Sequence, residues 1–242
     1  MKVVLLSSGL LLSLLGAGLR FLAGNTHFPK DPECTLTRVR HGTLRVGYTQ
    51  AAPWVVPAGA GPQGIEPVLV RALARHLGAR IEWVPGTEQH LYEALKQHQL
   101  DLLAAGITDE SPWKEEVGLT RPYAQTTVYV GASPGTPAGV VVRGQPVAVA
   151  AGTDLGHYVR EQQATPVPVG QLPGGHFLAA GYEWQLPRWG YRRLGPPLKQ
   201  ENHVLAVPPG ENAWLLAVET FLYQQHHEVH RLLYASPTYP AP

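Results

Sequence analysis

The chain has 242 residues, which is enough to bury a large core as one domain or as two small ones. Its formal net charge is +1 and only 15% of its residues are charged, so its electrostatics give no reason to expect a nucleic-acid partner. The chain contains a single cysteine, Cys34, and this count excludes an intramolecular disulfide.

The N-terminus has the pattern of an export signal. Lys2 precedes an apolar stretch over residues 3–19, which ends in the small residues Gly16-Ala17-Gly18. This combination of charge, length and ending is typical of a secretory signal, and an uncleaved stretch of the same length can also anchor a protein in a membrane. We therefore expect a signal peptide or N-terminal anchor over residues 1–24, a linker over residues 25–42, and a periplasmic or otherwise extracytoplasmic location for the rest of the chain.

Strands and helices alternate after the linker. Apolar runs predict strands over residues 43–48, 80–84 and 100–105. The first intervening helix opens near Pro67, which suits a first helical turn, and ends at Gly78, which suits a left-handed C-cap. Thr87 is the expected N-cap of the second helix. A β-α-β-α-β series with short connections predicts a parallel sheet with right-handed crossovers.

The end of the third strand indicates a binding site. Its apolar residues run directly into Gly106 and Thr108, and acidic residues follow. Ligands of open parallel sheets bind beyond the carboxyl ends of the strands, where a glycine lets the ligand approach the backbone and a threonine offers a hydroxyl group. The alternative interpretation is a plain turn that is capped by Thr108 and Asp109.

Most of the first half of the chain, residues 42–132, resembles a known family. The segments "GTLRVGYTQAAPW", "GIEPVLVRALARHLGARIEWV", "LYEALKQHQLDLLAAGIT" and "VGLTRPY" are similar, in order and spacing, to extracytoplasmic solute-binding proteins of the polar amino acid class (family 3), which serve ABC importers. Further along, "GQPVAVAAGTDLGHYV" resembles the start of a second lobe, and "NHVLAVPPGENAWLLAVETFL" resembles the return to the first. The resemblance implies an α/β, two-lobed periplasmic-binding-protein fold of type II, in which each lobe is a parallel-rich sheet flanked by helices.

The two lobes are expected to differ in size. We expect lobe 1 over residues 43–133 and 203–235, a small lobe 2 over residues 138–200, and a C-terminal tail over residues 236–242. The stretches "PGTPAG" (134–139) and "RLGPPL" (193–198) are rich in Gly and Pro, and we expect them to form the two crossings between the lobes.

The resemblance also implies ligand contacts at five positions of this sequence. Trp54 falls where an aromatic side chain packs against the ligand, and Gly106 and Thr108 fall where the family holds the ligand's polar end. Gly152 and Thr153 fall at the start of a second-lobe helix that receives a carboxylate, because the free N–H groups of a helix N-terminus suit an anion.

The sequence departs from the family at the residues that hold an α-amino acid. Counting along the chain puts Trp113 where the family has an arginine that pairs with the α-carboxylate, and an indole cannot form that bidentate ion pair. Lys114 and Arg121 are nearby candidates to supply the charge, and Glu183 is the nearest candidate to hold an α-amino group. Asp154 can cap the second-lobe helix itself. We therefore expect a ligand without an α-carboxylate, or one whose carboxylate is held by Arg121 or the Gly152-Thr153 backbone.

These residues predict a protein that binds a small polar or aromatic solute for ABC-type uptake or sensing. Membrane subunits of an importer are the expected partners, and no catalytic residue, cofactor or metal is expected. His226 and His230 have the i, i+4 spacing of a metal pair, but we interpret them as part of a solvated helix face. One alternative is a periplasmic dehydratase-like enzyme on the same fold, with Glu66, Glu110 and Glu183 as the available acids. The other is an accessory or signalling module attached to the membrane by the N-terminal segment.

Overall fold

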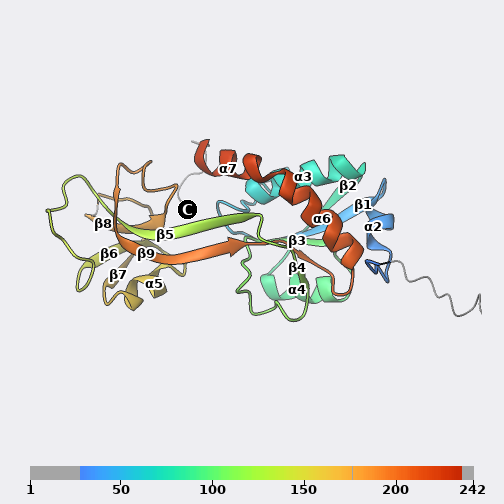
Figure 1. Cartoon of the computed structure of the whole chain (residues 1–242), viewed down its shortest axis with the longest axis horizontal. Coiled ribbons are helices and arrows are strands. Elements are labelled where there is room, and N and C mark those ends of the chain that lie inside the picture. Colours follow the sequence, from blue (N-terminus) through green and yellow to red (C-terminus); the bar gives the residue numbers. More distant parts are fainter. Residues whose placement is uncertain (1–27, 176, 236–242) are drawn as a thin grey trace, which may run out of the picture.

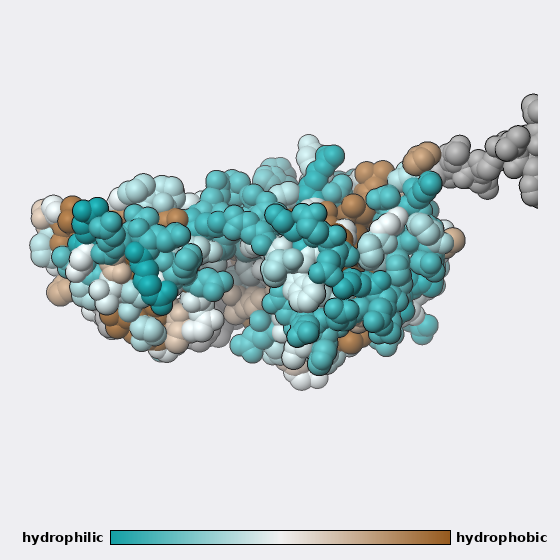
Figure 2. Space-filling view, turned by 90° about the horizontal axis from the view of Figure 1, so that it is seen from below, coloured by the Kyte–Doolittle hydropathy of each residue, from teal (hydrophilic) through white to brown (hydrophobic). Residues whose placement is uncertain are grey.

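The computed structural model describes residues 28–175 and 177–235, which form two lobes joined by two long antiparallel strands (Figure 1). The expected signal or anchor over residues 1–24 and the expected tail over residues 236–242 lie outside the described residues. Within the described ranges, no helix combines the length and the apolar character needed to cross a bilayer. Hydrophilic side chains cover most of the larger lobe on the face seen in Figure 2.

The larger lobe is built on a five-stranded mixed sheet with the strand order β2-β1-β3-β10-β4. Its strands are β1 (Thr43–Tyr48), β2 (Arg80–Pro85), β3 (Leu102–Ala104), β4 (Gly118–Leu119) and β10 (Ala206–Val207). The pairs of β1 with β2 and with β3 are parallel, whereas β10 is antiparallel to β3 and β4. The helices of this lobe are α2 (Thr35–Val39), α3 (Ile65–Leu77), α4 (Glu88–Lys96), α6 (Asn212–Gln224) and α7 (His226–Ala235). The predicted parallel β-α-β-α-β arrangement is confirmed.

Local sequence signals fix the ends of α3 and α4. Gly78 adopts the left-handed conformation expected of a C-cap, with φ 66°, and its N–H donates to the last turn of α3. The hydroxyl of Thr87 accepts the N–H of His90 at 3.5 Å, as expected of the N-cap of α4. Leu69 and Leu73 on the inner face of α3 are buried in the core of this lobe. The end of α3 and the start of α4 therefore lie where their capping residues predict.

A buried carboxylate holds the far end of this lobe together. Asp101 is fully buried and forms ion pairs with Arg38 at 2.5 Å and Arg45 at 2.6 Å. Burial alone would raise the pKa of Asp101, but the hydrogen bonds from Arg45 and Arg38 outweigh it and hold the pKa below its usual value. The indole N–H of Trp214, on α6, donates to the carbonyl of Asp101 at 2.7 Å. This one residue therefore links α2, β1 and α6.

The short helix α2 lies within the range that we expected to be a linker. The carboxylate of Glu211 accepts the N–H groups of Glu33 at 3.0 Å and Thr35 at 3.1 Å, which attaches the start of α2 to the start of α6. Between them, Cys34 is exposed and is a free cysteine, at the N-cap position of α2. Residues next to the first β-strand are therefore part of the folded lobe.

The smaller lobe also contains a five-stranded mixed sheet, with the strand order β7-β6-β8-β5-β9. Its elements are β5 (Ala124–Ala132), β6 (Pro146–Ala150), α5 (Leu155–Glu161), β7 (Thr165–Val169), β8 (Leu178–Tyr182) and β9 (Arg192–His203). The parallel pairs of β6 with β7 and β8 lie next to the antiparallel pairs of β5 with β8 and β9. With the first sheet, this gives the two-lobed α/β fold expected from the sequence.

The two crossings differ from the prediction. The lobes are joined by β5 and β9, which pair along almost their whole length, and not by the stretches 134–139 and 193–198. Residues 193–198 lie inside β9, where the register shifts opposite Val128 and Val130. Because β9 is an edge strand, its Gly- and Pro-rich stretch is accommodated in this irregularity, which explains why it resembled a linker in the sequence. β5 lies in the range expected for lobe 1, although its partners belong to the second sheet.

Candidate functional site

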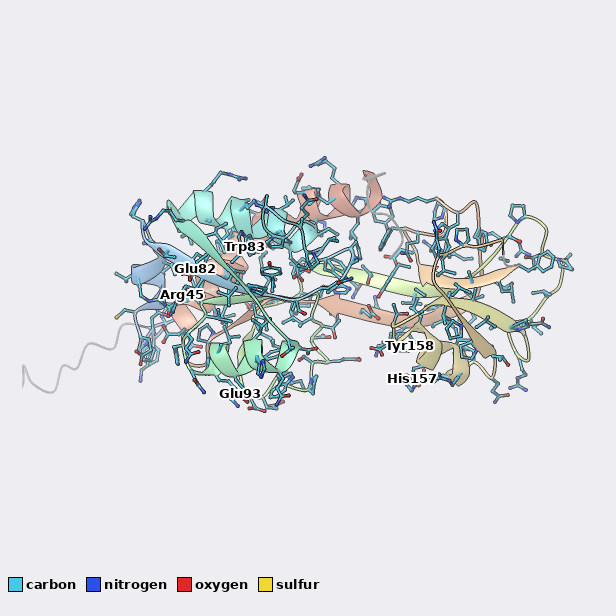
Figure 3. All side chains as sticks on the ribbon, turned by 180° about the vertical axis from the view of Figure 1, so that it is seen from behind. Arg45, Glu82, Trp83, Glu93, His157 and Tyr158 are labelled. Carbon is cyan, nitrogen blue, oxygen red and sulfur yellow. The ribbon has the colours of Figure 1, made fainter. Side chains whose placement is uncertain are left out.

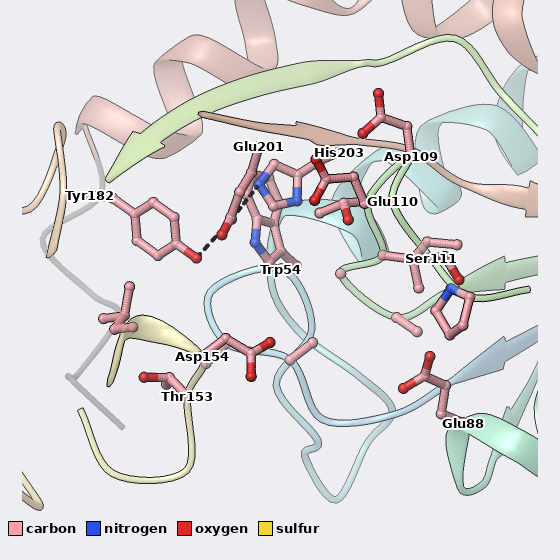
Figure 4. A pocket seen from close by; sticks show the side chains of 18 of the residues that line it. Trp54, Glu88, Asp109, Glu110, Ser111, Thr153, Asp154, Tyr182, Glu201 and His203 are labelled. Atoms are coloured by element: carbon pink, nitrogen blue, oxygen red, sulfur yellow. Dashed lines mark hydrogen bonds and ion pairs between the residues drawn. The ribbon is translucent and has the colours of Figure 1, made fainter. Parts of the chain in front are cut away.

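A cavity of about 440 Å³ lies between the two lobes (Figure 4). The larger lobe contributes Trp54, Glu88 and the loop that follows β3, over residues 105–112. The smaller lobe contributes the residues at the start of α5, together with Tyr158, Tyr182 and the end of β9. Both lobes therefore meet any molecule that occupies the cavity.

The turn after β3 has the conformation that a glycine permits. Gly106 has φ 65°, and a Cβ atom built on it would lie 2.7 Å from the Cβ of Ala51 and 3.0 Å from the ring of Trp54. Its N–H donates to both carboxylate oxygens of Glu66 at 3.1 Å, and the hydroxyl of Tyr123 donates to the same carboxylate at 2.7 Å. The first turn of α3 therefore fixes the backbone that lines the cavity.

The carboxyl group of Glu66 lies behind this turn and does not reach the cavity. It is fully buried, and burial raises its pKa to about 7 even though the hydrogen bonds from Tyr123 and Gly106 lower it. Glu66 is thus placed to hold the cavity wall and not to contact a ligand directly.

The loop beyond Gly106 is attached to the end of β9. The N–H of Val204 donates to the carbonyl of Ile107, and the N–H of Asp109 donates to the carbonyl of Asn202, both at 3.0 Å. Thr108 and His203 form an isolated antiparallel bridge between these bonds. The predicted binding loop and one of the two connecting strands therefore form a single hydrogen-bonded unit.

His203 forms the floor of the cavity next to Trp54. Their ring centroids are 3.8 Å apart, and a hydrogen bond of 2.9 Å joins the Nε2 atom of His203 to the hydroxyl of Thr126. Burial lowers the pKa of His203 to about 3, although the Gly106 backbone and the nearby charge of Asp109 oppose this. The imidazole is therefore neutral near pH 7 and cannot pair with a ligand carboxylate.

Five carboxylates line the cavity, and among the described residues no lysine or arginine does; the acids are Glu88, Asp109, Glu110, Asp154 and Glu201. Three of the five have side-chain partners, and the third, Glu201, is bound by two tyrosines. The ammonium of Lys199 lies 2.6 Å from both oxygens of Glu110, and the amide of Asn202 donates to Asp109 at 2.9 Å. The cavity as a whole therefore presents negative charge.

A pair of tyrosines positions the carboxylate of Glu201 in the smaller lobe. The hydroxyl of Tyr182 donates to it at 2.9 Å and that of Tyr158 at 3.4 Å. Burial raises the pKa of Glu201, against the lowering effect of the two hydroxyls. Figure 4 shows Tyr182 and Glu201 side by side, and Figure 3 shows Tyr158 on α5 near the strands that join the lobes.

The structure brings together four of the eight residues expected to bind a ligand. Trp54, Gly106, Thr108 and Thr153 line the cavity. Gly152, which precedes Thr153, does not line it, and the hydroxyl of Thr153 donates to the carbonyl of Ala150 at 2.7 Å. The helix that follows has only seven residues, and the side chain of Asp154 does not cap it. An acid thus stands where a carboxylate was expected to bind.

The other three expected residues lie outside the cavity. Trp113 stacks on Tyr92 with ring centroids 5.3 Å apart and packs against the core of the larger lobe, so it does not face a ligand there. The side chain of Arg121 is 89% exposed and lies 3.9 Å from Glu219. The carboxylate of Glu183 accepts the backbone N–H of Thr127. In the loop after β3, Ser111 lines the cavity instead, with its hydroxyl 3.0 Å from that of Tyr92.

Sequence reasoning missed most of the polar side chains in the cavity. Glu201 and His203 lie about one hundred residues after the Gly106 turn and follow a stretch that resembled a linker. The only signal for them was their position directly before "VLAVPPGENAW", the return strand and helix. Among the described residues, no group of three or more His, Cys, Asp or Glu side chains could hold a metal ion.

Comparison with known proteins agrees with this geometry. Residues 44–231 match the family described as bacterial extracellular solute-binding proteins, family 3. The membrane-bound lytic murein transglycosylase F of Shewanella baltica is 34% identical over 80 residues, and that of Vibrio cholerae is 32% identical over 80 residues. The match covers 33% of this chain but 17% of the Shewanella protein, and 32% of this chain but 15% of the Vibrio protein.

Several solved structures share the fold at low sequence identity. An ancestral cationic amino acid solute-binding protein superposes with a TM-score of 0.68 and 21% identity, covering 82% of this chain and 97% of its own. The L-cystine solute receptor of Neisseria gonorrhoeae gives 0.65 and 17%, covering 84% and 97%. An ABC transporter binding component of Wolinella succinogenes, complexed with lysine, gives 0.63 and 18%, covering 82% and 98%. At this level of identity the likeness concerns the fold alone.

Proposed function

Because this chain belongs to the family 3 bacterial extracellular solute-binding proteins, we propose that it binds a small, positively charged solute between its two lobes. One observation carries the proposal: five carboxylates line the cavity, and no lysine or arginine of the described residues does. A cationic group on the solute pairs with these acids, and Trp54 lines the cavity beside them. The proposal rests on the charge of the cavity and not on the likeness to proteins that are named for cationic amino acids.

The same charges argue against a solute with a free carboxylate. His203 is neutral near pH 7, and Asp154 occupies the helix start where a carboxylate would otherwise bind. A carboxylate buried without a partner costs on the order of several kcal/mol, which is enough to exclude binding at micromolar concentrations. We therefore expect simple L-amino acids to be poor ligands.

Solute binding outside the cytoplasm serves uptake or sensing in this proposal. The N-terminal segment, Lys2 and the apolar residues 3–19, would export the protein as a signal or hold it at the membrane as an anchor. The membrane subunits of an ABC importer are the proposed partners for uptake. Fractionation of cells that express the full chain tests the location, and recovery of the folded protein from the cytosol would contradict it.

Binding is favoured over catalysis by the positions of the acids considered for a dehydratase-like enzyme. Of Glu66, Glu110 and Glu183, only Glu110 lines the cavity, and its carboxylate is held by Lys199. Glu66 is buried behind Gly106, and Glu183 accepts a backbone N–H elsewhere. We infer a non-enzymatic role from this arrangement.

Two compounds of equal length and opposite charge test the proposal. We expect pentylamine to raise the melting temperature of the purified protein at pH 7.5 and to release heat on titration, because a ligand of the native state stabilises it. Pentanoate should do neither. Binding of pentanoate with an affinity equal to or above that of pentylamine would refute the proposed charge preference.

A further inference from the structure

We propose, building on the proposed function, that the natural solute carries two separate positive charges, one for each lobe, on an aliphatic chain without a carboxylate. Glu88 in the larger lobe and the pair Asp154 and Glu201 in the smaller lobe are the groups that would receive them.

Two of the acids that line the cavity need a partner from outside the protein. Glu110 already has the ammonium of Lys199, and Asp109 has the amide of Asn202. Within the described residues, the carboxylates of Glu88 and Asp154 form neither an ion pair nor a side-chain hydrogen bond. These two are therefore the lining acids without a partner among the described residues, and the partners of Asp109 and Glu201 are neutral groups, so Glu110 alone is paired with a cation.

The two acids without a partner stand on opposite lobes. Glu88 is the first residue of α4, whereas Asp154 directly precedes α5. Figure 4 shows the two carboxylates on different sides of the cavity, with Glu201 above Asp154. A ligand with one positive charge can neutralise the acid of one lobe only. The acid of the other lobe then stays unpaired and repels the other carboxylates of the cavity. A ligand with two positive charges can neutralise the acids of both lobes.

The aromatic lining of the cavity is an observation independent of the acids. The ring of Trp54 is buried and that of Tyr182 partly buried, and both line the cavity together with Tyr158. The tyrosine hydroxyls donate to Glu201, and the ring of Tyr182 stacks on Trp184 on one side, so the rings themselves form the aromatic part of the cavity wall. Methylene groups pack on such faces, and ammonium groups are attracted to them. A volume of about 440 Å³ suits a short chain of this kind.

Three ligands that differ by one group each provide the test. Cadaverine has two amino groups, pentylamine lacks the second, and L-lysine is cadaverine with an added carboxylate. In calorimetric titrations of the full-length protein at low and at physiological salt, we expect cadaverine to bind about tenfold or more tightly than either of the other two. We also expect calcium ions not to compete with cadaverine.

Paired variants assign the charges to the lobes. Glu88→Gln and Asp154→Asn should each reduce the affinity for cadaverine about tenfold and bring it close to that for pentylamine. Glu82→Gln, which removes an exposed acid outside the cavity, is the matched control and should change neither affinity. Melting curves of all three variants check that they remain folded.

The outcomes separate the two proposals. Equal affinities for pentylamine and cadaverine would overturn the two-charge inference and leave the preference for a cation intact. Tight binding of lysine, together with an unchanged affinity of the two variants for cadaverine, would have the same meaning. Displacement of cadaverine by calcium would also overturn the inference, because the acids would then form a metal site. Binding of pentanoate in place of either amine would overturn both.

Discussion

The carboxylate of Glu66 accepts the N–H of Gly106 with both of its oxygens, each at 3.1 Å. One residue in the first turn of α3 thus fixes the turn that lines the cavity, from a position that solvent does not reach. The contact explains why a carboxylate is retained in the core, and it makes the stability of the larger lobe sensitive to pH.

The first prediction concerns Glu66→Gln. Burial raises the pKa of Glu66 to about 7, above its usual 4.5, so the folded protein binds this proton more tightly than the unfolded chain does. The resulting stabilisation is complete below pH 4.5 and is lost as the pH rises through 7. Glutamine stays neutral, so we expect the wild type to lose about 3 kcal/mol relative to the variant between pH 5 and pH 8. Urea unfolding at both pH values measures this, and parallel losses in the two proteins would refute it.

The second prediction concerns His203, whose effect has the opposite sign. Burial lowers its pKa to about 3 from 6.5, so the unfolded chain takes up a proton below pH 6.5 while the folded protein does not. Stability is therefore lost as the pH falls from 6.5 towards 3. His203→Gln should lose about 2 kcal/mol less than the wild type between pH 7 and pH 5. An imidazole that titrates near pH 6.5 in NMR spectra of the folded protein would contradict this.

The third prediction concerns Trp113, which stacks on Tyr92 outside the cavity. Trp113→Arg should leave the affinity for amines and for L-amino acids unchanged, since a guanidinium at this position does not reach the ligand. The lost stacking should lower the unfolding free energy by roughly 1–2 kcal/mol. Trp113→Phe is the control, because it keeps an aromatic ring. New binding of an amino acid by the arginine variant would mean that the loop rearranges to face the cavity.

The fourth prediction concerns the ion pair of Lys199 and Glu110. The ammonium compensates one cavity acid, and its hydrogen bond to Glu110 raises the pKa of Lys199. Lys199→Gln should therefore increase the affinity for amines several-fold and make it fall more steeply with salt. Lys114→Gln, an exposed lysine that does not line the cavity, is the control. Calorimetry at two salt concentrations decides, and weaker amine binding by the Lys199 variant would exclude this role.

The fifth prediction concerns Asp101, which is buried between Arg38 and Arg45. Asp101→Asn leaves two guanidinium groups without their shared carboxylate, so we expect the unfolding free energy to fall by about 3–5 kcal/mol. Amine affinity should not change at temperatures where the variant is folded, since Asp101 does not line the cavity. If urea unfolding shows that the variant loses less than about 1 kcal/mol, solvent makes up for the two lost ion pairs of Asp101.

The sequence predicts the parts of this fold that depend on local chemistry. Gly78 and Thr87 mark helix ends through backbone conformation and capping, and Gly106 marks a close backbone approach, so each could be identified from its neighbours. Glu201 could not, because the pairing of the second sheet brings it to the same cavity as Asp154.

The errors have equally specific causes. Trp113 was assigned by counting along a loop, and counting does not register the turn in which the N–H of Ser111 bonds to the carbonyl of Thr108. Residues 193–198 resembled a linker because Gly and Pro are rare in strands, yet an edge strand with a shifted register accepts them. The first error therefore comes from a local turn, and the second from the pairing of strands that are distant in the sequence.

Cys34 gives the chain a single attachment point for a fluorescent label. It is the only cysteine of the sequence, and its exposed thiol stands on the larger lobe. Val141 is exposed on the smaller lobe, so Val141→Cys adds one further thiol there. A donor and an acceptor dye at these two positions would report the distance between the lobes by energy transfer, with no native cysteine to remove first.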